Sequence, residues 1–97
     1  MHTPIELEIT DNKGAAFLKQ NGKQLAEMTF SLAGDTLMII DHTDVDDSLR
    51  GQGIGRKLLD KVLQYAENEE RKIMPLCPYA KSVFDKDESI KKFLRHS

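Results

Sequence analysis

The sequence predicts one α/β domain over residues 1–97, with a mixed sheet of four mostly antiparallel strands, then a helix, a parallel fifth strand and C-terminal helices. Three observations support this prediction. Apolar and polar residues alternate with a period of two in the N-terminal part of the chain. A glycine-rich turn then precedes a helical pattern with apolar residues four positions apart. A short apolar run follows, and a strand, helix and strand in succession imply a parallel pair with a right-handed crossover.

The first three strands are expected to form an antiparallel meander. The first covers residues 5–10, where apolar and polar residues alternate strictly. A second strand candidate covers residues 15–20, and Asn21-Gly22 follows it. Asn-Gly between two strand-like runs is the strongest short-range signal for a β-hairpin. The third strand covers residues 26–32 and alternates as clearly as the first.

The fourth strand is expected over residues 37–45 and differs from the others, because it opens with four apolar residues in a row. Such a run is typical of a central strand covered on both faces. The main helix is expected over residues 53–69, with one apolar face packed on the sheet. The fifth strand is short, at residues 73–76. Pro75 lies within it and cannot donate to a ladder, so we expect pairing with the neighbouring strand to be interrupted there.

Two further helices are expected at the C-terminal end. Pro78 suits the first position of a helix, where its missing N–H costs nothing. A last helix is expected to begin near Asp85 or Asp87, with a buried stripe of Ile90, Phe93 and Leu94. The chain shows no linker, repeat or low-complexity segment, and its length fits one domain.

Composition excludes several classes of protein. The formal net charge of −2 gives no reason to expect nucleic-acid binding, and no apolar run is long enough to span a membrane. Residues 1–4 lack the layout of a signal peptide. The single cysteine, Cys77, excludes an intrachain disulfide and a Cys-rich zinc site, and no His/Asp/Glu spacing predicts a metal site. We therefore expect a soluble cytoplasmic protein without a metal.

The glycine-rich segment Arg50-Gly51-Gln52-Gly53-Ile54-Gly55 predicts an anion site. The first turn of a helix leaves backbone N–H groups without partners and carries a partial positive charge. Arg56 and Lys57 also lie in this turn, where cations oppose the helix dipole unless an anion is bound. The spacing is neither the dinucleotide fingerprint nor a Walker A loop. The alternative is a solvated turn with ordinary surface charges.

This segment resembles the Arg/Gln-x-x-Gly-x-Gly/Ala signature of the GNAT superfamily of acyl-CoA-dependent N-acetyltransferases. His42-Thr43-Asp44-Val45 and Leu76-Cys77-Pro78-Tyr79 resemble the short, compact branch of that superfamily. The order of elements agrees too, so the resemblance covers nearly the whole chain. It implies a GNAT-like fold that binds acetyl-CoA, with the coenzyme A pyrophosphate on the loop amides and the pantetheine arm between two strands that splay apart. The implied cofactor-binding residues are Thr43, Asp44, Val45, Arg50, Gly51, Gln52, Gly53, Ile54, Gly55, Arg56 and Lys57.

Cys77 is the first catalytic candidate. It lies at the end of a strand and near the start of a helix, a position that favours a nucleophilic thiolate. The resemblance places it near the acetyl thioester, where it could form an acetyl-cysteine intermediate. The alternative is a small buried hydrophobe.

Tyr79 and His42 are the other two candidates. The resemblance implies that a tyrosine after the fifth strand protonates the departing coenzyme A thiolate, and Tyr79 is near that position. Its alternative is a core tyrosine with its hydroxyl at the surface. His42 could take a proton from an ammonium substrate, if its side chain points that way, or it could be a structural histidine.

The resemblance implies an N-acetyltransferase that acts on an amine of a small molecule or a protein. The preferred route is direct attack of a neutral amine on the thioester, with the oxyanion stabilised by backbone N–H groups around residues 43–45. Larger superfamily members carry one or two helices where this chain has only residues 11–14. The acceptor site is therefore open, completed by a second subunit of a homodimer, or specialised for an unusual acceptor. The alternative function is a non-catalytic acyl-CoA-binding or sensing module.

Overall fold

Four consecutive strands form an antiparallel meander, as the alternating pattern predicts. The hairpin between the second and third strands turns at Asn21 and Gly22, which both have positive φ (52° and 77°). A fifth strand pairs in parallel with the fourth, so the order in the mixed sheet is β1-β2-β3-β4-β5. The strands are β1 (Glu6–Thr10), β2 (Lys13–Gln20), β3 (Lys23–Ala33), β4 (Leu37–Val45) and β5 (Lys72–Pro75).

This computed structural model describes residues 5–95. The N-terminal segment on which the expectation about a signal peptide rests, residues 1–4, lies outside them, as do residues 96–97. Among the described residues, no helix combines the length and the apolar character that crossing a membrane requires.

Residues 5–95 also form two α-helices and two short 3-10 helices, all after β4, with β5 between the two α-helices. They are η1 (Asp47–Leu49), α1 (Ile54–Asn68), α2 (Pro78–Lys86) and η2 (Glu88–Phe93). The main helix and the helix that starts at Pro78 agree with the sequence prediction. The last element is a 3-10 helix in which Ile90 is buried, whereas Phe93 is only partly buried.

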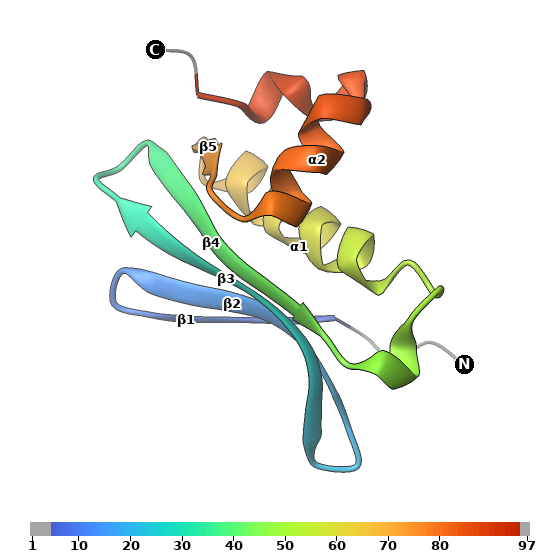
Figure 1. Ribbon diagram of the computed structural model, residues 1–97. Helices are drawn as coiled ribbons and strands as arrows, with labels where there is room; N and C mark the ends of the chain where they lie inside the picture. Colours follow the sequence, from blue (N-terminus) through green and yellow to red (C-terminus); the bar gives the residue numbers. More distant parts are fainter. Residues whose placement is uncertain (1–4, 96–97) are drawn as a thin grey trace.

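The core lies on one face of the sheet. Most side chains of β3 and β4 that point to this face are buried against the apolar stripe of α1, which runs beneath β1 to β4. Figure 1 shows α1, α2 and η2 all on this side of the sheet. The largest fully buried side chains are Phe30, Phe84, Met28, Met38, Ile40, Leu58, Leu59, Ile73 and Val62.

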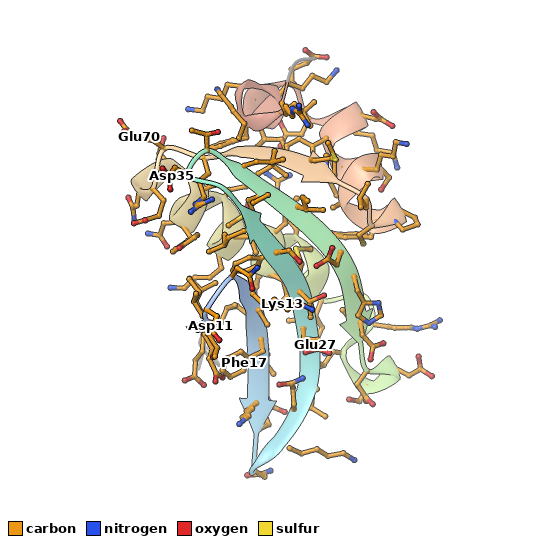
Figure 2. The ribbon with its side chains drawn as sticks, turned by 90° about the vertical axis from the view of Figure 1, so that its left-hand side faces the viewer. Asp11, Lys13, Phe17, Glu27, Asp35 and Glu70 are labelled. Atoms are coloured by element: carbon orange, nitrogen blue, oxygen red, sulfur yellow. The ribbon has the colours of Figure 1, made fainter. Side chains whose placement is uncertain are left out.

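The opposite face of the sheet carries no helix among the described residues, and we call it the helix-free face. Figure 2 looks onto it and shows Lys13, Phe17 and Glu27. Leu37 and Ile39 of β4 point to this face and are only partly buried. The prediction that the fourth strand is covered on both faces is therefore wrong. The reason is that α1, α2 and η2 lie on the other face, and only a tight turn connects β1 to β2.

A β-bulge in β4 decides which side chains face the core. Thr29 of β3 pairs with His42, and the next residue, Phe30, pairs with Ile40, so Asp41 is the extra residue. The bulge reverses the alternation: Ile40 faces the core before it, and Thr43 faces the core after it. His42 is exposed on the helix-free face as a result.

Candidate functional site

The strands β4 and β5 separate at the position that Pro75 predicts. Their pairing ends with Ile40 opposite Pro75. The amides of Leu76 and Cys77 then both donate to the carbonyl oxygen of Ile40, at 3.0 and 3.2 Å. Beyond this point β4 continues to Val45 without a β5 partner, while the chain after β5 turns into α2. One side of β4 is therefore left unpaired next to the start of α2, and we call this place the strand gap.

A preformed loop connects the end of β4 to α1. The Asp46 carboxylate accepts hydrogen bonds from the hydroxyl (2.6 Å) and the amide (3.0 Å) of Ser48. These bonds hold the pKa of Asp46 below its ordinary value. Leu49 is buried and anchors the loop in the core. Gly51 and Gly53 follow with φ of 78° and 69°, a conformation that L side chains rarely adopt.

Two helix N-termini meet at this loop. Gly53 is the N-cap of α1 and Cys77 is the N-cap of α2, and neither N-terminus has a side-chain capping bond or an acidic residue in its first turn. The two first turns touch, because the ring of Tyr79 lies against Gly55. Uncapped helix N-termini present free N–H groups and the positive end of the helix dipole. Both therefore favour an anion here.

The cations near the loop are already engaged with carboxylates. Arg50 pairs with Asp47 at 3.0 Å, and both side chains are exposed. Arg56 pairs with Asp60 at 2.9 Å and with Asp87 at 2.8 Å, and these bonds raise the pKa of Arg56. The second pair ties α1 to the N-cap of η2. In this structure the guanidinium of Arg56 thus has a structural role.

Lys57 lies apart from these pairs. It is exposed and lines a groove of about 610 Å³ along α1, together with Lys61 and Phe93. Lys57 and the backbone amides of the loop and of α1, rather than Arg50 and Arg56, are therefore the groups left to hold an anion.

Cys77 lies at the inner end of the strand gap. Its side chain is 3% exposed, and its Sγ is 3.0 Å from the Oγ1 of Thr43, with either atom able to donate. The bulge at Asp41 turns Thr43 toward the core side and so brings it to Cys77. The sequence predicts both residues as part of the site. Their direct contact is not visible in the sequence, because it depends on the bulge.

Tyr79 and His42 occupy different sides of the sheet. Tyr79 lies in the first turn of α2 and is 37% exposed. Burial raises its pKa, the neighbouring Arg56 lowers it, and Asp60 raises it, with a net upward shift. His42 lies on the helix-free face. The structure thus brings Tyr79 to the helix side of the strand gap and keeps His42 on the other side.

The sequence did not reveal the part played by Asp87, which receives Arg56 and accepts hydrogen bonds from the amide and hydroxyl of Ser89. An Asp two positions before a Ser is the same local pattern as Asp46 and Ser48 and could have suggested a helix cap. Within residues 5–95, no group of three or more potential ligands is placed to hold a metal ion.

Comparisons with known proteins agree with this fold. Residues 15–93 match the family described as GCN5-related N-acetyl-transferase. The chain is 32% identical to a GCN5-like protein from Staphylococcus aureus of known structure, with a TM-score of 0.72 and coverage of 100% of this chain and 93% of that one. It is 26% identical to Protein NATD1 of Gallus gallus over 96% of this chain and 84% of that protein.

The fold also resembles that of a more distant acetyltransferase from Bacillus anthracis, solved in complex with acetyl coenzyme A. That structure is 18% identical, with a TM-score of 0.61, and the match covers 84% of this chain and 47% of that one. At this identity the likeness concerns the fold.

Proposed function

Because the chain belongs to the GCN5-related N-acetyltransferase family, we propose that it transfers the acetyl group of acetyl-CoA to an amine of a small molecule or a protein. The observation that carries this proposal is the pair of uncapped helix N-termini beside the strand gap. The backbone amides of residues 51–55 are free to hold the diphosphate of coenzyme A. The unpaired part of β4, residues 43–45, is free to bind an extended pantetheine arm.

The chain's own residues fit the reaction. Acetyl-CoA supplies the acetyl group as a thioester, and attack by an amine forms the C–N bond and breaks the C–S bond. Backbone N–H groups of β4 at the strand gap are the candidates for stabilising the negative charge that develops on the carbonyl oxygen. Tyr79 holds its proton at neutral pH because a phenol ordinarily titrates at about pH 10 and burial raises its pKa further, so it is a candidate to protonate the departing thiolate.

The acceptor amine is expected to approach from the helix-free face. His42 is exposed on this face beside the strand gap, and Asp41 and Asp44 are exposed next to it. A polar hollow of about 280 Å³ at the ends of β3 and β4 is lined by further carboxylates, among them Glu27 and Asp46. Negative charge raises the local concentration of a cationic amine, and His42 is the candidate group to take its proton.

The direct test measures release of free thiol from acetyl-CoA in the presence of a broad panel of amines and peptides. We expect one class of amine to raise thiol release well above the rate with acetyl-CoA alone. Tight binding of acetyl-CoA without turnover across the whole panel would contradict the enzymatic function.

The second candidate function is a non-catalytic acyl-CoA-binding or sensing module. The short β1–β2 connection favours it, because no described segment builds a wall around an acceptor on the helix-free face. A second copy of the chain is one source of such a wall. Partner capture that depends on acetyl-CoA, together with absence of turnover, would select this function over the first.

Cys77→Ala separates the two chemical routes. In the direct route we expect the variant to retain turnover within a few fold of the unchanged protein, since the amine itself attacks the thioester. In the covalent route the thiol of Cys77 attacks first, and its acetyl group then passes to the amine. Intact mass after incubation with acetyl-CoA distinguishes them. An added acetyl group that disappears in Cys77→Ala, with loss of turnover, would replace the direct route by the covalent one.

A further inference from the structure

The three glycines of the loop meet different structural requirements. Gly51 and Gly53 have positive φ, and a Cβ on either would meet no atom within 4 Å. Gly55 lies inside α1 and its φ is not positive. A Cβ there would lie 2.8 Å from Cζ of Tyr79, closer than real Cβ contacts, and 3.0 Å from its hydroxyl oxygen, which is tighter than most, so the ring would have to shift. The backbone conformation therefore explains the first two glycines, and the ring of Tyr79 explains the third.

We propose that Gly55 is a positioning residue, whose missing side chain seats the phenol of Tyr79 on the first turn of α1. The hydroxyl is thereby held where the two uncapped helix N-termini meet. A phenol at this place can donate its proton to an anionic group bound there. The inference rests on the proposed function for its effect on turnover, but not for the contact itself.

The contact between Gly55 and Tyr79 can be tested by its effect on stability, independently of turnover, because alanine and glycine differ in helix propensity. Alanine is a better helix former than glycine, so Gly55→Ala should favour α1 wherever Tyr79 does not oppose it. With Tyr79 present, the added methyl group must push the ring away from the helix. The same substitution should therefore have opposite effects on stability with and without the ring.

The experiment is a double-mutant cycle of Gly55→Ala and Tyr79→Ala, measured by kcat, KM and Tm. Gly55→Ala alone is expected to lower kcat by about a hundredfold, the order expected for a reacting group misplaced by about 1 Å, and to lower Tm. In the Tyr79→Ala background it is expected to change kcat far less than it does alone, and to raise Tm. Equal effects of Gly55→Ala in both backgrounds would overturn the proposal.

A control and a spectroscopic reading separate positioning from general loss of stability. Val62→Ala removes buried volume from the same helix away from the loop, so it should lower Tm and leave kcat unchanged. In a Tyr65→Phe background Tyr79 is the single tyrosine, and its ionisation can be followed by ultraviolet absorbance. Arg56, Asp60 and Cys77 are the charged or titratable groups that act on it.

Displacing the ring into solvent should move the pKa of Tyr79 down toward its ordinary value in Gly55→Ala, because burial is the main cause of the upward shift. An unchanged titration would contradict the proposed contact. Both this titration and the Tm cycle can be measured without substrate. They therefore still decide the role of Gly55 if the amine panel shows no turnover and the enzymatic function fails.

Discussion

Gly53→Glu is expected to weaken acetyl-CoA binding by about a hundredfold or more. Gly53 is the N-cap of α1, at an N-terminus without a capping side chain or an acidic residue. A carboxylate there would repel the diphosphate, and two unit charges about 4 Å apart near a protein surface interact by about 4 kcal/mol. The new side chain would also occupy the space in front of the loop amides. Isothermal titration calorimetry with acetyl-CoA measures the loss.

Gly34→Glu is the matched control for this substitution. Gly34 also has positive φ (61°), its Cβ would also meet no atom within 4 Å, and it lies in the turn between β3 and β4. Both variants thus introduce the same charge and the same strained backbone conformation. Gly34→Glu should bind acetyl-CoA like the unchanged protein. Similar losses in the two variants would show that strain or net charge, rather than the loop, causes the effect.

Phe30→Ala is expected to lower the free energy of unfolding by about 3–5 kcal/mol. Phe30 is 1% exposed, and its ring stacks on Tyr65 with 6.0 Å between centroids. It also fills the space above Gly14, where a Cβ would come within 2.5 Å of it. A small domain has only about 5–15 kcal/mol of stability in total. Urea unfolding followed by circular dichroism gives the change directly.

Phe93→Ala provides the comparison within the same protein. Phe93 is only partly buried at the end of η2, so its truncation should cost less than half as much as that of Phe30. If the two variants lost the same free energy of unfolding, the packing of α1 against β3 would not be the centre of the core.

The sequence was sufficient to predict the five strands, the two α-helices and their order. Alternation in β1 and β3 and the Asn21-Gly22 turn predict the meander, because side-chain period and turn geometry are local properties. The apolar stripe of α1 predicts its packing on the sheet in the same way. Pro75 predicts where β4 and β5 separate, since a proline cannot continue the ladder.

Properties that depend on distant contacts were less predictable. The apolar run at the start of β4 indicates burial on both faces, but Ile39 lies on the helix-free face, and only the placement of the helices decides this. The bulge leaves no trace in the sequence, because Asp41 is polar like the residues that follow it. The contact of Gly55 with Tyr79 joins two helices, and the carboxylate partners of Arg56 lie partly on a third element.

In the candidate site, too, local features could be predicted from the sequence and features that depend on distant contacts could not. The glycine loop and the uncapped start of α1 follow from the sequence, because a helix terminus is a local structure. The directions of His42, Thr43 and Cys77 do not, because each depends on the bulge or on the turn into α2. The role of each predicted residue in binding or catalysis stays a prediction for the experiments above.

The single extra residue in β4 has a consequence for comparing this chain with its relatives. In a β-strand, odd-numbered and even-numbered residues point to opposite faces of the sheet. In β4 the even-numbered residues face the core before Asp41, and the odd-numbered residues face it after Asp41. A related sequence that lacks one residue here would present to one face the positions that this chain presents to the other. An alignment across β4 should therefore match residues that face the same side of the sheet, both before and after the bulge. A gap placed after Thr43 instead of at Asp41 would pair Thr43 with a residue of the opposite face.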